Sequence, residues 1–502
     1  MTSRIERVHA REVFDSRGKP TVEVEVTCAG ARPGRAMVPS GASTGRFEAV
    51  ELRDRGDSRL DGLGVRQAVR NVCTEIASAI VGLDADDQAE IDRRLIELDG
   101  TPQKSRLGAN AILGTSLAVA YASAEARGLS AVARFREIWN TVPLPLREGG
   151  RRPGEGRAAS DVPTRIDSRS LKNNETTTST VNCIPHPSPL PKGEGTAACR
   201  THELGTRMLM PLPMINMISG GLHAGRQLEF QDFLILPVGA TSYSQAFDWI
   251  VTVYRRLGRV LTERGHEGIL IGDEGGYGPK LHTNEEAIEL VVAAIEAAGL
   301  KPDSDVAIGL DVASTHFFED GRYRLPNVSS SPLSAEQMVD LLEGWIARYP
   351  IISLEDPLAE DDWDGWRLIT ERLGNRVQLI GDDLFVTNVA RLQEGIERGV
   401  ANSVLIKLNQ IGTLSETLAA LKLANDNGYW PVVSARSGET EDATIADLVV
   451  ATGAGQLKVG SVARSERLAK YNQLLRLEES LGADASYLGG EIFESLRSER
   501  GS

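Results

Sequence analysis

The segment Ile351-Ile-Ser-Leu-Glu-Asp356, a short apolar run that ends in two acidic residues, decides the fold. Runs of this kind recur from residue 211 onward, separated by stretches with helical spacing. Strands that are apolar throughout are typical of a parallel sheet, because helices cover both of its faces. Eight such strands in roughly 250 residues fit a closed α/β barrel. The eight expected strands are Phe233–Leu236, Gly268–Gly272, Val306–Leu310, Ile351–Leu354, Val377–Ile380, Val404–Ile406, Pro431–Val433 and Leu457–Val459.

Residues 1–135 have the pattern of a small α+β domain. Polar and apolar residues alternate over Thr21–Thr27, as in a strand with one face in water. Apolar residues between Val65 and Ile80 recur at spacings of three and four, which predicts a helix. The uncharged run Leu107–Ala124 approaches the length of a membrane span, but its Asn, Ser and Thr residues and its many Ala and Gly residues favour a buried helix with close neighbours.

The composition changes abruptly over residues 136–206, which we expect to be a disordered or loosely packed insertion. Residues 141–206 contain 8 of the 22 prolines and no Phe, Trp or Tyr, so they offer little for a core. Such a segment is either a Pro-rich arm that binds a partner or an acquired loop, and we favour the loop because long insertions add little closure entropy. The catalytic α/β barrel domain is then expected over residues 207–502.

The overall charge and the cysteines restrict the partners and the compartment. Lys plus Arg number 55 and Asp plus Glu 70, and the net charge of −15 argues against nucleic acid or an anionic membrane as the main partner. Four cysteines without a C-x-x-C pair indicate neither a disulfide framework nor a zinc ribbon, which favours the reducing cytoplasm. The first residues contain no apolar stretch of signal-peptide length.

Polar residues follow the expected strands at their carboxyl ends, where an α/β barrel collects its active site. A single acidic residue at such a point is usually a helix N-cap or a turn residue, but acidic residues follow four consecutive strands here. The polar residues are Asp273, Glu274, Asp311, Glu355, Asp356, Asp382, Asp383, Lys407, Arg436, Ser437 and, within the last strand, Lys458.

Three of these carboxylates predict a metal site. Asp311, Glu355 and Asp382 would converge on one point, and three carboxylates cannot all stay ionised there without a cation. Oxygen ligands without His or Cys favour Mg²⁺, and zinc is the weaker choice. Lys407 follows the next strand, where nearby positive charge is expected to lower its pKa so that the amine can act as a base.

The remaining polar residues predict an acid and an anion site. Glu274 lies on a Gly-rich turn, from which a carboxyl could protonate a leaving hydroxyl. Arg436, Ser437 and Lys458 suit a phosphate group, because a guanidinium binds two of its oxygens and lysine adds a point charge. The substrate implied is a phosphorylated carboxylic acid.

Nine segments, in order along the chain, resemble the signatures of the enolase family. The resemblance covers nearly all of the chain except residues 136–206. It implies a Mg²⁺-dependent, reversible dehydration of 2-phosphoglycerate to phosphoenolpyruvate, a proton abstraction beside a carboxylate for which this superfamily is the reference example. The segments are Asp15–Gly18, Val38–Gly45, Leu107–Leu113, Gly272–Gly276, Leu354–Pro357, Gly381–Leu384, Ile406–Gly412, Arg436–Asp442 and Ala463–Lys470.

The resemblance implies a role for each matching residue. Lys407 would remove the C2 proton and Glu274 would act as the acid at the C3 hydroxyl. Ser43, in a loop that closes over the site, would help to bind a second Mg²⁺, and His223 stands in a second loop of the same lid. The ligands of the tighter Mg²⁺ would be Asp311, Glu355 and Asp382. The substrate contacts would be His223, Gln231, Arg436, Ser437 and Lys458.

Two departures from the family pattern fall at the expected site. Asp232 stands where the family usually has Glu, which shortens a carboxylate on the acid side by one methylene, and a misplacement of about 1 Å can lower a rate about 10²-fold. Ala435 stands where the family has His, so that position offers no imidazole. Lys19 and Phe47 also differ from the common family residues.

Three functions follow from these observations. The first is an active enolase, a lyase of glycolysis. By analogy with the family it is expected to be a cytoplasmic homodimer, and some family members are also displayed at the cell surface. The second is a paralogue that acts on another carboxylic acid, motivated by Asp232 and Ala435, although the complete Ser40–Gly45 loop favours the first. The third is a non-catalytic scaffold that binds a partner through residues 136–206.

Overall fold

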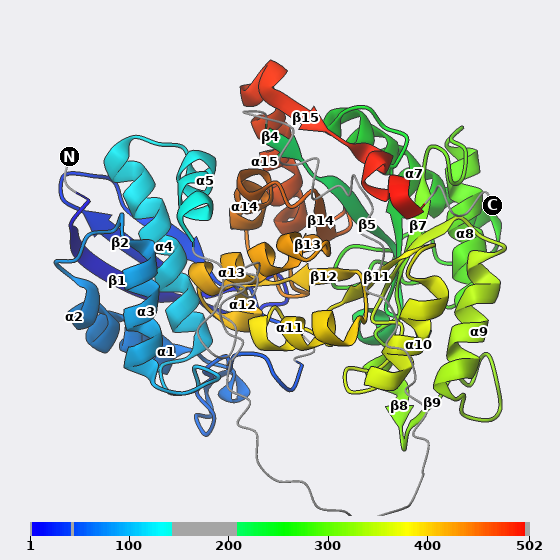
Figure 1. Ribbon diagram of the computed structural model, residues 1–502, viewed down its shortest axis with the longest axis horizontal. Helices are drawn as coiled ribbons and strands as arrows, with labels where there is room; N and C mark the ends of the chain where they lie inside the picture. The colour runs from blue at the N-terminus through cyan, green and yellow to red at the C-terminus, as the bar shows by residue number, and fades with distance from the viewer. Residues whose placement is uncertain (1–2, 42–44, 143–207, 497–502) are drawn as a thin grey trace, which may run out of the picture.

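The computed structural model describes residues 3–41, 45–142 and 208–496 of the 502. The chain forms a smaller N-terminal domain and a barrel domain, side by side in Figure 1. The predictions for Ser43 and for the insertion from residue 143 onward lie outside the described residues.

The N-terminal domain is a three-stranded antiparallel sheet with helices packed against it. The alternating segment forms β2, and the periodic segment from Val65 to Ile80 is helical, as expected. Helix α5 continues past residue 135, where we placed the start of the insertion, because Phe135 and Ile138 are buried in the core. The elements are β1 (Ile5–Phe14), β2 (Pro20–Cys28), β3 (Gly34–Met37), α1 (Arg66–Asn71), a π-helical turn (Val72–Ile76), α2 (Ala77–Ile80), α3 (Gln88–Asp99), α4 (Ala109–Arg127) and α5 (Ala131–Thr141).

Helix α4 is the buried helix that the uncharged run predicts. It packs on β2 and β3, and the approach is close because Gly34 has no side chain: a Cβ at this position would lie 2.1 Å from the backbone N of Ala122. No helix among the described residues is long and apolar enough to span a membrane.

The second domain is a closed eight-stranded barrel in the order β5-β6-β7-β10-β11-β12-β13-β14. Its strands are β5 (Leu212–Ser219), β6 (Asp232–Leu236), β7 (Ala307–Asp311), β10 (Ile351–Glu355), β11 (Gln378–Gly381), β12 (Ser403–Ile406), β13 (Trp430–Ser434) and β14 (Gln456–Gly460). Its helices are α7 (Tyr243–Glu263), α8 (Asn284–Ala297), α9 (Ala335–Ile346), α10 (Trp363–Leu373), α11 (Val389–Arg398), α12 (Leu408–Ile411), α13 (Leu414–Asp426), α14 (Thr444–Thr452) and α15 (Ser465–Leu481). Two small sheets pair β4 (Met208–Met210) with β15 (Ala485–Tyr487), and β8 (Phe318–Glu319) with β9 (Arg322–Tyr323).

One expected strand is wrong and another was missed. Gly268–Gly272 is a loop, in which Ile269 is 82% and Leu270 60% exposed, so its apolar residues do not signal a core. The barrel instead uses β5, which is buried throughout but contains Pro213 and follows Pro211. Proline lacks the N–H that a central strand donates, and the segment therefore lacks a clear strand signature.

The barrel is also not parallel throughout. Strand β6 runs antiparallel to both β5 and β7, whereas the other neighbouring strands are parallel. A parallel neighbour needs a long crossover, usually a helix. Between β5 and β6 the chain forms only a loop with one short 3₁₀ turn, Gly221–Ala224, so it returns in the opposite direction.

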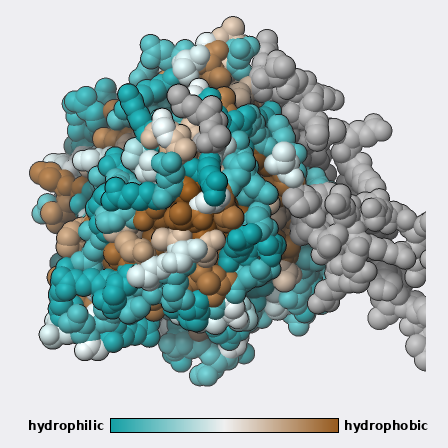
Figure 2. All heavy atoms as spheres, turned by 90° about the vertical axis from the view of Figure 1, so that its left-hand side faces the viewer, coloured by the Kyte–Doolittle hydropathy of each residue, from teal (hydrophilic) through white to brown (hydrophobic). Residues whose placement is uncertain are grey.

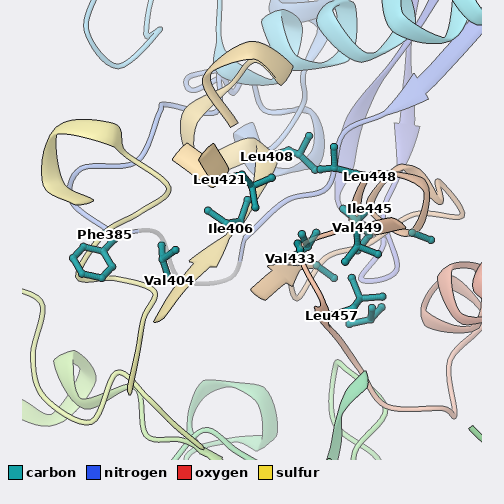
Figure 3. Packing of buried hydrophobic residues seen from close by; sticks show 14 of the residues in the cluster. Phe385, Val404, Ile406, Leu408, Leu421, Val433, Ile445, Leu448, Val449 and Leu457 are labelled. Carbon is teal, nitrogen blue, oxygen red and sulfur yellow. The ribbon is translucent and has the colours of Figure 1, made fainter. Parts of the chain in front are cut away.

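Alternation along the strands decides which side chains enter the barrel. Ile406 of β12 lies beside Leu421 of α13 and Val404 lies nearer Phe385 (Figure 3), all in the outer cluster, whereas Leu405 belongs to a separate cluster inside the barrel. Successive side chains of a strand point to opposite faces, so Lys407 continues the inward series of Leu405. The strand geometry thus turns Lys407 toward the barrel mouth.

The N-terminal domain packs against the barrel beside this mouth. Helix α5 contacts α14, and α4 contacts α12 and α13. The backbones of Ser40 and Gly438 exchange two hydrogen bonds, of 2.8 and 2.9 Å. Residues of the N-terminal domain therefore reach the end of the barrel where the active site is expected.

On the side of the molecule shown in Figure 2, hydrophilic residues surround a smaller hydrophobic area.

We predict that Gly34→Ala destabilises the protein by about 1–3 kcal/mol, because the added methyl would overlap the backbone of α4. The matched control is Gly344→Ala in the interior of α9, where a Cβ meets nothing within 4 Å; this change should stabilise by up to about 1 kcal/mol. Urea denaturation measures both, and equal effects would contradict the close packing of α4.

Candidate active site

A pocket opens at the carboxyl ends of the barrel strands. Nine of the expected site residues line it, and Asp232 and Glu355 are each hydrogen-bonded to a lining residue, His223 and Lys458 respectively. The lining residues are Glu48, His223, Gln231, Glu274, Asp311, Ala313, His316, Asp356, Asp382, Asp383, Lys407, Ser434, Ala435, Arg436, Ser437, Lys458, Val459 and Gly460.

Lys458 binds two of the expected metal ligands. Its Nζ lies 2.7 Å from Oδ2 of Asp311 and 2.6 Å from Oε2 of Glu355, and all three side chains are buried. Burial and the Asp311 charge raise the pKa of Glu355 to about 8, although Lys458 opposes this. Burial disfavours a charged lysine, but the two carboxylates outweigh it and raise the pKa of Lys458. The site thus holds more negative charge than this lysine alone offsets.

Lys407 binds the third expected ligand. Its Nζ lies 2.5 Å from Oδ2 of Asp382, and Nε2 of Gln410 donates to Oδ1 of Asp382 at 2.8 Å. Burial lowers the pKa of Lys407, but the Asp382 carboxylate outweighs it, so that the pKa is raised. In the chain without a metal ion the nearest charge is negative, so the lowering expected beside a bound cation stays a prediction.

The residue after Glu355 organises the neighbouring turn. Asp356 has a φ of 39°, which is unusual for a non-glycine residue, and its carboxylate accepts from the amides of Asp382 at 3.0 Å and Asp383 at 2.8 Å. Burial and Asp383 raise the pKa of Asp356, and burial and Asp382 raise that of Asp383 to about 8. These two carboxyls were noted at the strand ends without a role, and the structure adds them to the site.

His223 connects two carboxylates on another side of the pocket. Its Nδ1 lies 2.9 Å from Oδ2 of Asp232, and its Nε2 lies 3.9 Å from Oε1 of Glu274. Burial opposes a charged ring, but Asp232 and Glu274 outweigh it and raise the pKa of His223 to about 9. Burial raises the pKa of Asp232 to about 6 despite His223. Burial alone would raise the pKa of Glu274, but nearby positive charges, chiefly that of His223, outweigh burial and lower it.

Arg436 is held by a residue of the N-terminal domain that the sequence did not single out. Its Nη1 lies 2.9 Å from Oε2 of Glu48 and donates to Oδ1 of Asn409 at 2.8 Å. Beside it, Oγ of Ser437 accepts from Nη1 of Arg17 at 3.1 Å. Glu48 lies just beyond the Val38–Gly45 signature, and only the packing of the two domains brings it to Arg436.

Gln231 keeps one polar atom free among the described residues. Its Nε2 donates to Oδ2 of Asp311 at 3.2 Å, while its buried Oε1 has no hydrogen-bond partner in this part of the chain. A buried acceptor without a partner costs free energy, and a ligand in the pocket would satisfy it. The substrate contact expected of Gln231 stays a prediction.

The donor set fits Mg²⁺ better than a softer metal. Asp311, Glu355 and Asp382 stand at the ends of the neighbouring strands β7, β10 and β11 and offer only oxygen, which Mg²⁺ prefers. Their carboxylates are divided between Lys458 and Lys407. Among the described residues, two groups of three side chains have ligand atoms within 4.8 Å of one another, namely His223–Asp232–Glu274 and Asp356–Asp382–Asp383. Of the three expected metal ligands, only Asp382 belongs to one of these groups.

A closed α/β barrel with carboxylates and lysines at the carboxyl ends of its strands has the architecture of an α/β-barrel enzyme. The profile of the enolase C-terminal TIM barrel domain matches residues 207–496, and that of the enolase N-terminal domain matches residues 5–133. The chain belongs to the enolase family.

We predict that the ring of His223 titrates near pH 9. The folded pKa lies above the ordinary value of 6.5, so this proton stabilises the folded state fully below about pH 6.5, and the stabilisation disappears as the pH rises through about 9. Asp232→Asn removes the negative charge that most stabilises the protonated ring, so the titration midpoint of His223 should move toward 6.5.

NMR spectra of the histidine rings measure this titration. His316 in the same pocket is the internal control, since burial lowers its pKa below 6.5. An unchanged His223 midpoint in Asp232→Asn would contradict the ion pair.

Proposed function

We propose that this protein catalyses the reversible dehydration of 2-phosphoglycerate to phosphoenolpyruvate with Mg²⁺. One observation carries the proposal, which is that a single pocket contains every group the reaction needs. It is lined by the lysine Lys407, the pair Glu274 and His223, the carboxylates Asp311 and Asp382 as candidate metal ligands, and the guanidinium of Arg436. The reaction needs a base at C2, an acid at C3 and binding groups for two anions, and the pocket contains a candidate for each.

Asp311, Glu355 and Asp382 would hold the Mg²⁺. When bound, the ion would neutralise the substrate carboxylate and the negative charge that develops on it during proton removal. Burial and the Asp311 charge raise the pKa of Glu355, and a cation at these carboxylates would offset both effects.

Lys407 would remove the C2 proton in its neutral form. In the chain by itself Asp382 keeps the amine protonated. If Asp382 binds the metal ion, its negative charge would stabilise the protonated form of Lys407 less. The positive charges of Arg436 and Lys458 lower the pKa of Lys407 and would then favour the neutral amine. The electron pair of the C2–H bond then moves toward the carboxylate.

The leaving hydroxyl would receive its proton from the His223–Glu274 pair. The pKa of His223 is raised and that of Glu274 lowered, so at neutral pH the proton resides on His223. Asp232 holds the ring from its other nitrogen, and its Oδ1 accepts from Asn216. With this proton the C3 hydroxyl leaves as water and the C2–C3 double bond forms.

Arg436 and Ser437 would bind the phosphate. Both stand just beyond β13, and the guanidinium is buried, where an ion pair is screened little by water. In this structure Glu48 and Asn409 fix the orientation of the guanidinium. Glu48 would therefore partly neutralise the Arg436 charge and weaken its attraction for the phosphate.

We predict that Lys407→Ala lowers the rate of phosphoenolpyruvate formation about 10²- to 10⁴-fold, because the base is lost. The control is Lys301→Ala, an exposed lysine outside the pocket, which should leave the rate unchanged. The absorbance of phosphoenolpyruvate measures both, with and without Mg²⁺. Full activity of Lys407→Ala, or of the wild type after chelation, would refute the proposed mechanism.

We predict that the wild type is active and that Asp232→Glu with Ala435→His raises its rate less than about tenfold. Asp232 already reaches His223 at 2.9 Å and is fully buried, so a longer side chain gains no contact and crowds its surroundings. The same assay compares the two enzymes. An inactive wild type that gains activity on reversion would instead indicate a paralogue that acts on another acid.

A further inference from the structure

His316 is a pocket residue to which neither the sequence nor the proposed mechanism gives a role. It lies in the 3₁₀ turn Ser314–Phe317 that follows β7 and lines the pocket beyond Asp311. Its ring nitrogens make no hydrogen bond to the described residues, unlike those of His223. The ring is thus available to a ligand in the pocket.

The turn that carries His316 is held rigidly at both sides. Ser314 donates to the backbone O of Asp356 through its amide at 3.1 Å and through its hydroxyl at 2.9 Å. On the other side, Phe317 stacks on Phe230 with ring centroids 6.3 Å apart. Fixed neighbours hold a binding group in place before the ligand arrives, which lowers the entropy lost on binding.

The protonation of His316 suits hydrogen bonding to a neutral group. Burial, together with the positive charges of Arg226 and His223, lowers its pKa below the ordinary 6.5, although Asp311 and Asp382 oppose this. At neutral pH the ring is uncharged, with one nitrogen that donates and one that accepts. A hydroxyl group, which also donates and accepts, matches this pair.

The position of His316 in the barrel indicates which end of the substrate it meets. In the closed strand order, β7 lies four strands from β13 in either direction, so His316 stands across the mouth from Arg436 and Ser437. It stands on the side of His223, whose charge acts on its ring. In 2-phosphoglycerate the phosphate is on C2, between the C1 carboxylate and the C3 hydroxyl. With the phosphate at Arg436 and the carboxylate at the metal ligands, the C3 hydroxyl would face His223 and Glu274, on the side of the mouth where His316 stands.

We propose that His316 binds the C3 hydroxyl of the substrate and positions it for protonation by the His223–Glu274 pair. The inference rests on the proposed function, because it assumes a three-carbon acid that carries a phosphate on C2 and a hydroxyl on C3. Ala435, which lines the pocket just beyond β13, offers no side-chain donor, so it cannot replace His316 in this role.

The test compares two ligands that differ only in the hydroxyl. Binding of 2-phosphoglycerate and of 2-phospholactate, which lacks the C3 hydroxyl, is measured by calorimetry with Mg²⁺ in the Lys407→Ala background, where turnover does not interfere. His316→Ala should weaken 2-phosphoglycerate about tenfold, as expected for one lost hydrogen bond, and leave 2-phospholactate unchanged. His316→Gln, which retains a donor, should weaken 2-phosphoglycerate less.

The control is His282→Gln, at an exposed histidine outside the pocket, which should change neither affinity. Equal weakening of both ligands by His316→Ala, or of neither, would overturn the role of His316 even if the wild type forms phosphoenolpyruvate. A ligand-dependent loss in an enzyme that forms no phosphoenolpyruvate would keep this role and refute the proposed reaction. Failure of both acids to bind would refute both proposals.

Discussion

The burial of three carboxylates at one end of the barrel is the constraint on which the site depends. Asp311 and Glu355 share the ammonium of Lys458, and Asp382 pairs with Lys407. Removing one partner from such a buried pair typically costs about 3–5 kcal/mol, because the other charge is left without compensation. Yet two lysines do not neutralise the cluster, as the raised pKa of Glu355 indicates. Under the proposed function, a divalent cation would supply the remaining positive charge.

The two domains complete the site together. The barrel supplies the metal-type carboxylates and both lysines, whereas the N-terminal domain supplies Glu48, which orients Arg436, and Arg17, which contacts Ser437. The Ser40–Gly438 backbone hydrogen bonds join the domains next to these contacts. The orientation of the Arg436 guanidinium therefore depends on where the N-terminal domain packs.

The errors in the sequence predictions have physical causes. Ile269 and Leu270 form an apolar run without a core to contact, and β5 is a core strand despite Pro213, so composition alone assigned the wrong segment to the barrel. The antiparallel β6 follows from a connection too short for a crossover helix. The sequence also does not show that the amine of Lys407 points at Asp382, which raises its pKa when no metal is bound.

The sequence by itself determined the barrel class, the small α+β domain, and the acidic and basic residues at the strand ends, since these follow from local periodicity and from the position of a residue relative to a strand. Only the tertiary structure decided which carboxylate pairs with which lysine, that Glu48 holds Arg436, that Asp232 reaches His223 despite its shorter side chain, and that His316 faces the pocket. These facts join residues far apart in the chain. Distances between them depend on how the strands close into a barrel and on where the N-terminal domain packs, and no local pattern encodes either.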